Sequence, residues 1–170
     1  MTTTNNICTY IVPTATFEVT MPAQPAFLAY VDTTVDDVTG DSTIYTVCSD
    51  DNTTVYDQNA DYDDAGTFTA PVDGQYEFIG IVTLDDIAAA GTSGRTKIDT
   101  SNRGYAAASQ NTFAMSVAAT GSCSLESNVL ADMDAADTAI FTTGVYFMAK
   151  IVDVVGGAVR YSCFGGRLVC

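Results

Sequence analysis

The residues of this chain that could carry out chemistry are acidic. Its 170 residues include 21 aspartates and glutamates, six lysines and arginines, and no histidine. Histidine is the usual general base near neutral pH and a common metal ligand. Its absence excludes hydrolases that activate a serine or a cysteine through histidine. What remains is carboxylate chemistry, either the binding of a hard cation or acid–base catalysis by paired acids.

One acidic stretch has a spacing that could suit calcium. The sequence from Asp61 follows the pattern D-x-D-x-x-G, with Asp63 and Asp64 inside it, and begins like an EF-hand loop. That loop needs oxygen ligands at its fifth and twelfth positions as well, where this chain has alanine and valine. An EF-hand is therefore excluded. Two interpretations stay open, a solvated acidic loop or a calcium site of another kind at these three aspartates.

Three further aspartates, Asp132, Asp134 and Asp137, could form an acid–base pair. Hydrolysis of a glycosidic bond needs two carboxylates facing each other across a cleft. These aspartates lie in an alanine-rich segment without a nearby aromatic platform for a sugar. We therefore interpret them as a surface turn.

The glycine-rich segment 91–95 (GTSGR) resembles a phosphate-binding loop only loosely, because the Gly-Lys-Ser/Thr ending is missing. We interpret it as the end of a hairpin, in which Arg95 and Lys97 compensate the charges of Asp85 and Asp86. No catalytic arrangement is left. The chain is therefore predicted to be non-enzymatic and to use no cofactor, with calcium as the one open possibility.

The net charge is −15. An acidic surface repels nucleic acids and anionic membranes, so neither is an expected partner. No apolar run approaches the 18 residues of a membrane-spanning helix. The opening residues MTTTNNICTYIVPTATF lack the basic and apolar regions of a signal peptide. We expect neither export by the usual route nor a membrane anchor.

The five cysteines are an odd number, so at least one is free or pairs between chains. No C-x-x-C pair occurs, which leaves zinc binding and thioredoxin-like chemistry without support. Two interpretations stay open. The cysteines are small apolar residues buried in strands, or some form disulfides, with Cys163 and Cys170 as candidates because they flank the last predicted strand.

Short runs rich in β-branched and aromatic residues alternate with glycine, asparagine and aspartate turn signals. This spacing is typical of an all-β sandwich or barrel. Residues 1–24 are expected to form an extended N-terminal arm, and residues 25–170 one domain. The one helical turn considered lies at 131–137, where Asp132 could cap it. The predicted strands are 25–31, 43–48, 54–57, 66–70, 75–84, 95–99, 112–118, 123–130, 138–150 and 158–169.

Two predicted strands are apolar on both faces. In 75–84 the aromatic residues alternate with polar ones, and the run is then almost wholly apolar from Ile79 onward; 138–150 has the same character. A strand buried on both faces needs two covers, and a neighbouring subunit is the natural second one. Both strands are therefore predicted to lie in a sheet whose outer face is an oligomer interface. The residues assigned to the core or to this interface are Phe27, Tyr76, Phe78, Ile81, Phe141, Tyr146, Phe147, Phe164 and Leu168.

Four segments, taken in order, resemble the globular head of complement component 1q and its relatives in the tumour-necrosis-factor superfamily. The resemblance covers about residues 25–169 and implies an antiparallel two-sheet jelly-roll sandwich of ten strands that forms a homotrimer. It also implies that calcium could bind near the trimer apex. Residues 85–137 match poorly, and no collagen-like stalk is present. The matching segments are PAFLA at 25–29, YD at 62–63, G-x-F-x-x-P-x-x-G-x-Y-x-F at 66–78 and SCFGGRL at 162–168.

The expected function is that of a trimeric decoration or cement protein on the outer surface of a bacteriophage capsid. Such a protein would be assembled in the host cytoplasm and bound to the lattice of the major capsid protein, whose local three-fold sites match a trimer. The alternatives are a receptor- or glycan-binding knob of a phage fibre and a soluble complement-type ligand-binding head. Apolar residues of the arm would dock on a partner or pack on the chain's own trimer: Ile7, Tyr10, Ile11, Val12 and Phe17.

Overall fold

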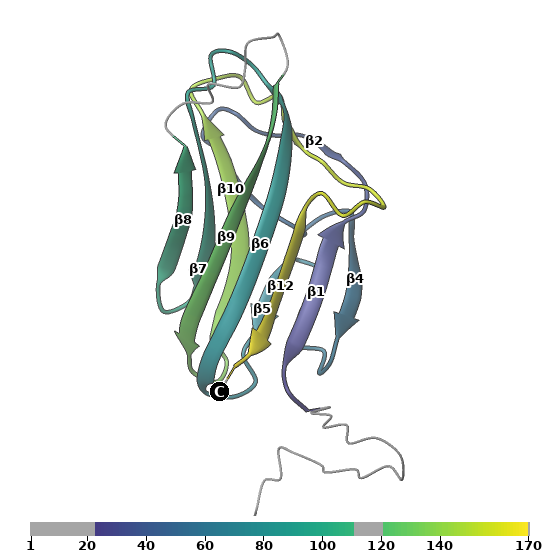
Figure 1. Cartoon of the computed structure of the whole chain (residues 1–170), viewed down its shortest axis with the longest axis vertical. Helices are drawn as coiled ribbons and strands as arrows, with labels where there is room; N and C mark the ends of the chain where they lie inside the picture. Colours follow the sequence, from purple (N-terminus) through teal and green to yellow (C-terminus); the bar gives the residue numbers. More distant parts are fainter. Residues whose placement is uncertain (1–22, 111–120, 170) are drawn as a thin grey trace, which may run out of the picture.

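The structure is a computed structural model that describes residues 23–110 and 121–169. These residues form two antiparallel sheets packed face to face (Figure 1). They contain no helix, and so none long and apolar enough to cross a membrane. The strands are β1 (Ala26–Val31), β2 (Val35–Thr39), β3 (Ile44–Thr46), β4 (Asn52–Asp57), β5 (Thr67–Thr69), β6 (Gly74–Ile87), β7 (Ser93–Thr100), β8 (Gly104–Gln110), β9 (Gly121–Met133), β10 (Thr138–Tyr146), β11 (Val152–Val154) and β12 (Cys163–Leu168).

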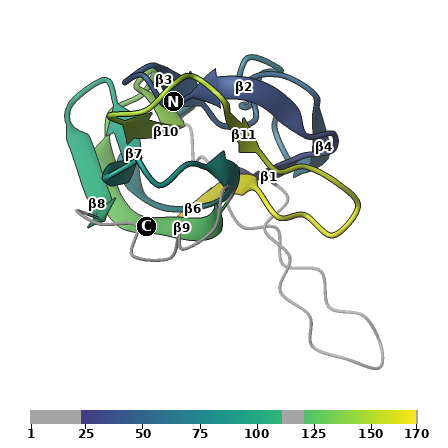
Figure 2. The same cartoon turned by 90° about the horizontal axis from the view of Figure 1, so that it is seen from above.

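The larger sheet has seven strands in the order β2-β11-β6-β12-β1-β4, and β9 also pairs with β6. The smaller sheet has five strands in the order β3-β10-β7-β8, and β5 pairs with β10. The chain crosses between the sheets after β2, β3, β4, β5, β6, β8, β9 and β10, which is the connectivity of a jelly roll rather than of a meander. Viewed from above, the strands surround a common interior (Figure 2).

Aromatic rings fill the space between the sheets because alternate residues of each strand point inward. Phe27 is at the centre of this core. Its ring lies 4.7 Å from the ring of Tyr62 and 5.0 Å from that of Phe68, both stacked, and 5.1 Å from that of Phe164. Five of the aromatic residues assigned to the core or interface are completely buried inside the single subunit: Phe27, Tyr76, Phe78, Phe141 and Phe164.

Three strands were not predicted, and each depends on its neighbours. β2 is acidic, with Asp37 in a left-handed conformation, β11 has three residues, and β8 is rich in alanine, which has low strand propensity. β7 and β6 supply the hydrogen-bonding partners of β8 and β11. The predicted strand 112–118 lies outside the described residues.

The helical turn considered at 131–137 is not formed. β9 continues through Met133 in register with β6, so Asp132 is a strand residue opposite Gln75. The bend comes afterwards, where Asp137 donates its backbone N–H to the carbonyl oxygen of Asp134. Pairing with the long strand β6 outweighs the local tendency of the alanines to be helical.

The prediction that the two doubly apolar strands share one sheet is also wrong. β6 is in the seven-stranded sheet and β10 in the five-stranded one. At Gly144 the outer face of β10 is covered by its own chain, since a Cβ there would lie 2.7 Å from Cδ1 of Ile44 and 3.4 Å from the hydroxyl oxygen of Tyr146. β10 also ends at Tyr146, so Phe147 is largely exposed instead of belonging to a buried strand.

The described cysteines are free thiols. Cys48 and Cys123 are buried and Cys163 is half-buried, which fits small apolar residues in a sandwich better than disulfide partners. Cys163, one of the two disulfide candidates, is a free thiol; the other candidate, Cys170, lies outside the described residues.

Candidate functional site

The outer face of the seven-stranded sheet is the part of this fold that presents an ordered set of uncovered apolar residues. Strand register places five residues in one row across five strands. Tyr56 of β4 lies opposite Leu28 of β1, which lies opposite Gly165 of β12, and Ile79 of β6 and Asn128 of β9 follow. Because side chains alternate along each strand, all five positions are on the side away from the aromatic core.

A second row flanks the first and contains charged residues. Arg167 of β12 lies opposite Glu77 of β6, and Leu130 of β9 follows. The guanidinium of Arg167 donates from both Nη2 and Nε to Oε2 of Glu77, at 2.7 and 2.9 Å. The ion pair is exposed, so it adds little to the stability of a single subunit.

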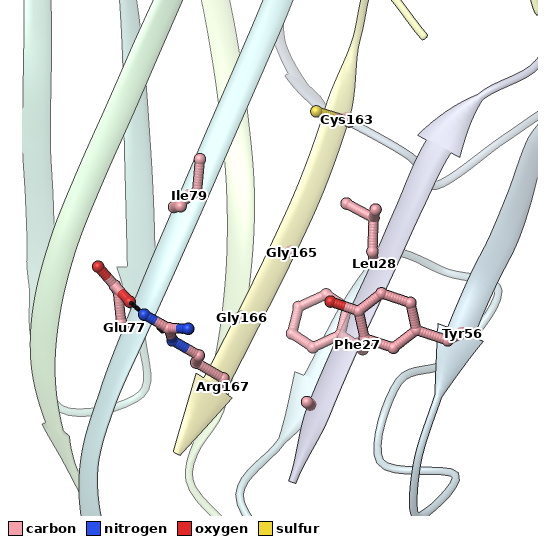
Figure 3. A pocket seen from close by; sticks show the side chains of 10 residues that line it. Phe27, Leu28, Tyr56, Glu77, Ile79, Cys163, Gly165, Gly166 and Arg167 are labelled. Atoms are coloured by element: carbon pink, nitrogen blue, oxygen red, sulfur yellow. Dashed lines mark hydrogen bonds and ion pairs between the residues drawn. The ribbon is translucent and has the colours of Figure 1, made fainter. Parts of the chain in front are cut away.

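Gly165 opens a groove in this face. Without a side chain at Gly165, a hollow of about 300 Å³ runs along β12. Leu28 and Tyr56 lie on one side of β12, and Ile79 with the Glu77–Arg167 pair lies on the other (Figure 3).

The two adjacent glycines of β12 are on opposite faces of the sheet. A Cβ on Gly166 would point inward and lie 2.5 Å from the ring of Phe78, which requires glycine at that position. A Cβ on Gly165 would point outward, 3.1 Å from Cδ1 of Leu28. Gly166 therefore allows the core to pack, whereas Gly165 shapes the outer surface.

Large apolar side chains surround the groove and are open to solvent. Leu130 is 55% and Ile79 45% exposed, although both lie within paired strands. A contiguous apolar patch of this kind is typical of an interaction surface. The exposed large apolar residues on these strands and beside them are Val55, Tyr56, Ile79, Leu130 and Val169. We call this surface the association face.

Three residues assigned to the core or interface are half-buried. Ile81 and Leu168 belong to strands of the association face, Ile81 at an outward position, whereas Tyr146 lies on the opposite sheet. The residues of the groove and of the association face that sequence reasoning did not assign are Leu28, Val55, Tyr56, Leu130, Gly165 and Val169. Of these, Leu28 had a usable signal, since it alternates with buried Phe27 and Ala29.

The thiols of this region are protonated at neutral pH. Burial raises the pKa of Cys163, which lines the groove, and raises that of Cys48 to about 12. A thiol is a nucleophile or a metal ligand as its thiolate. These cysteines therefore act as small apolar groups.

The calcium candidates do not converge on one point. Oδ1 of Asp63 accepts the backbone N–H groups of Ala65 and Thr67 at 3.0 and 2.8 Å, so Asp63 caps a turn. Burial raises the pKa of Asp61, and Asp64 is exposed. Within residues 23–110 and 121–169, no group of three or more acidic, cysteine or histidine side chains is placed to hold a metal ion.

The second acidic set has structural partners. Asp132 accepts Nη2 of Arg103 at 2.7 Å and the hydroxyl of Tyr105 at 3.1 Å. Asp137 accepts the hydroxyl of Ser101 at 2.7 Å, and this hydrogen bond is the main reason why its pKa is lowered. These aspartates therefore bind a turn and a strand together and do not face each other across a cleft.

The predicted pairing of Arg95 and Lys97 with Asp85 and Asp86 is wrong. Lys97 pairs with Asp99, two residues further along the same face of β7. The guanidinium of Arg95 lies over the ring of Tyr146. The arm residues Ile7, Tyr10, Ile11, Val12 and Phe17 lie outside the described part of the chain.

Comparison with known proteins shows the fold. No family model and no curated protein matches the sequence. Among solved structures, the globular domain of a zebrafish complement 1qA protein aligns over 86% of this chain and 98% of its own, with 18% identity and a TM-score of 0.54. The Eiger TNF of S. frugiperda covers 86% and 93%, with 13% identity and a TM-score of 0.57. Murine APRIL covers 86% and 99%, with 10% identity and a TM-score of 0.51. The predicted all-β, antiparallel, two-sheet jelly roll is confirmed.

Proposed function

We propose that this chain is a non-enzymatic binding head that forms a homotrimer through its association face. The observation that carries the proposal is the row of apolar side chains around Gly165, of which Ile79 and Tyr56 are open to solvent in the single subunit. Burying this row removes apolar surface from water, which is the main driving force of association.

The arrangement of the face favours a closed ring. The groove and the exposed side chain of Leu130 are at different positions on the face, so the groove on one subunit could receive Leu130 of the next. Contacts between unlike patches close into a ring when the rotation allows it. Three-fold closure is the symmetry that the resemblance to complement-type heads implies.

The non-enzymatic character rests on chemistry. The sequence contains no histidine, and the carboxylates of Asp63, Asp132 and Asp137 are used as caps and ion-pair partners. The buried thiols are protonated, because burial raises the pKa of Cys48 and Cys163. The described groups thus supply a rigid scaffold for binding.

Native mass spectrometry of the purified full chain tests the trimer. The expected mass is three times the subunit mass of 17.8 kDa, and the complex should persist after dilution into the low micromolar range. A monomer at the subunit mass would contradict the proposal, and a dimer would contradict the three-fold arrangement.

The setting that we propose for this trimer is the outer surface of a phage capsid, where it would act as a decoration or cement protein. Its support is the charge, which is −15 per subunit and three times −15, or −45, for a trimer. Such a charge keeps particles apart in solution. A trimer bridging neighbouring capsid subunits would stabilise the shell through mass action, with residues 1–24 as the docking arm.

Quantitative mass spectrometry of purified particles from the source culture distinguishes the settings. A copy number comparable to that of the major shell protein supports decoration. A few copies per particle would indicate the alternative, a receptor- or glycan-binding fibre knob. Absence from particles would indicate a soluble complement-type ligand-binding head. Deletion of residues 1–24 should abolish attachment, and unchanged attachment would contradict the docking role of the arm.

A further inference from the structure

Three of the six basic side chains form ion pairs, and Arg95 is not among them. The pairs are Lys97 with Asp99, Arg103 with Asp132 and Arg167 with Glu77. The guanidinium carbon of Arg95, whose side chain is exposed, lies 5.7 Å from the centroid of the half-buried Tyr146 ring. No described carboxylate pairs with Arg95, although the chain has 21 acidic residues. Its planar donors are therefore left for a ligand.

Phe147 presents an exposed aromatic ring beside that of Tyr146. It is 73% exposed, and its backbone is left-handed, with a φ of 72°. The turn has a structural reason, because it allows Met148 to donate its N–H to the carbonyl oxygen of Gly40 at 3.1 Å and to pack against the core. Glycine or asparagine would adopt this conformation at lower cost than a bulky residue. The turn therefore explains the left-handed backbone of Phe147, but it does not explain why this position carries a phenyl side chain.

The three residues Arg95, Tyr146 and Phe147 form one surface, which we call the cation–aromatic patch. β7 and β10 pair so that Arg95 lies opposite Gly144, two residues before Tyr146, and the rings of Tyr146 and Phe147 lie 6.3 Å apart. The patch is on the five-stranded sheet, across the sandwich from β12 and β6 (Figure 2). It is complete within one subunit and remains accessible when the association face is covered.

We propose that the cation–aromatic patch binds a sugar ring that carries a carboxylate, such as a uronic acid residue of a glycan. The guanidinium can hold a carboxylate through two parallel hydrogen bonds. The phenyl ring of Phe147 can stack on the C–H face of a pyranose, whose hydroxylated side then stays in water. An aromatic ligand would bind more strongly in an enclosed pocket than against the single exposed ring of Phe147.

The charge of the chain limits the ligand further. A net charge of −15 repels long polyanions, so the patch fits a ligand with a single carboxylate at the contact. Three copies in a trimer would act together on a surface that displays many such sugars, and would bind it far more tightly than one copy does.

Isothermal titration calorimetry and NMR titration of the full chain with sodium glucuronate test this proposal, with glucose as the neutral probe. Saturable binding of glucuronate is expected, and glucose should bind at least about tenfold more weakly, since it lacks the charged hydrogen-bond acceptor. Arg95→Gln and Phe147→Asn should each weaken glucuronate binding by about tenfold or more. Asparagine suits the left-handed backbone, so the second variant should remain folded.

Arg160→Gln is the matched control. The guanidinium of Arg160 also lies over an aromatic ring, that of Tyr30 at 5.2 Å, but on the other sheet. This variant should bind glucuronate like the unmodified chain. The proposal is overturned by the absence of saturable binding at tens of millimolar, by equal binding of glucose, by unchanged binding in Arg95→Gln, or by loss of binding in Arg160→Gln alone. A preference for benzoate over glucuronate would also overturn it.

The proposed trimer is tested separately from this site. A monomeric variant should bind glucuronate with the same affinity per subunit, because the patch lies within one chain. A chain that binds glucuronate but is monomeric would contradict the trimer alone, and a trimer that does not bind it would contradict the sugar site alone.

Discussion

Replacement of Ile79 by glutamate tests the association face at a single position. Ile79 is in the middle of β6, points away from the core and keeps 45% of its surface exposed. Ile44 of β3, in the other sheet, keeps 43% exposed. Ile44→Glu therefore introduces the same charge at a nearly equal exposure on a face that the proposed trimer leaves free. The two variants separate the loss of subunit contacts from any effect on the fold.

The magnitude follows from burial and desolvation. Full burial of an isoleucine side chain is worth about 1.5–3 kcal/mol, so burying the exposed 45% of Ile79 contributes about 0.7–1.4 kcal/mol per subunit contact. Glutamate removes this contribution and adds several kcal/mol for desolvating a carboxylate, two residues from Glu77 on the same face. Each contact should weaken by at least about 3 kcal/mol, more than about a hundredfold.

Sedimentation velocity over a concentration series is the assay, with far-ultraviolet circular dichroism as the check on folding. Ile79→Glu should sediment at the subunit mass of 17.8 kDa with an unchanged strand spectrum, and Ile44→Glu should sediment as a trimer. A trimeric Ile79→Glu at micromolar concentration would refute the assignment of this face. Dissociation of both variants would show that added charge alone, and not the position on the association face, causes the effect.

Three further predictions concern the glycines and the thiols. Gly166→Ala should lower the free energy of unfolding, measured with urea, by about 1–3 kcal/mol, because its Cβ would lie 2.5 Å from the Phe78 ring. Gly165→Ala should instead weaken association, measured by sedimentation. Cys163, which lines the groove, should react with a thiol reagent faster in the dissociated glutamate variant than in the trimer, and equal rates would place the groove outside the interface. The pKa of Cys48 is raised by burial from 9.0 to about 12. The unfolded chain therefore loses this proton first, and the contribution to stability, complete below pH 9, should fall between pH 9 and 12 by at most about 1.4 kcal/mol per pH unit. Cys48→Ala should make that alkaline loss less steep, as measured by urea unfolding across this pH range.

The strands that alternate strictly could be predicted from the sequence. In β6 the aromatic residues Tyr76 and Phe78 alternate with Gln75 and Glu77, and all four residues face as the alternation predicts. The alanine-rich strand β8 could not be predicted, because alanine favours a strand here through pairing with β7 and not through its own propensity. The same reason explains why no helical turn forms at Asp132, which pairing with β6 holds in a strand.

The sequence indicated an uncovered apolar side on β6 but not the residues of other strands that lie beside it. An apolar run on both sides of a strand indicates that a second cover is needed, and Ile79 confirms such an exposed side for β6. The same pattern in β10 was misleading, because Ile44 and Tyr146 from its own subunit cover Gly144. The sequence within one strand indicates how apolar each face of that strand is. Which residues pack on that face depends on segments far away in the chain.

The sequence by itself determined the alternating strands, the acidic surface and the lack of histidine chemistry, because each of these depends on residue type and on spacing within one segment. The tertiary structure alone decided which apolar residues stay uncovered. Tyr56, Leu28, Gly165 and Ile79 become one row only through the register of four strands drawn from distant parts of the chain. The physical reason is that alternation along a strand assigns each side chain to one of two faces. The pairing between strands then determines which side chains lie next to one another on a face.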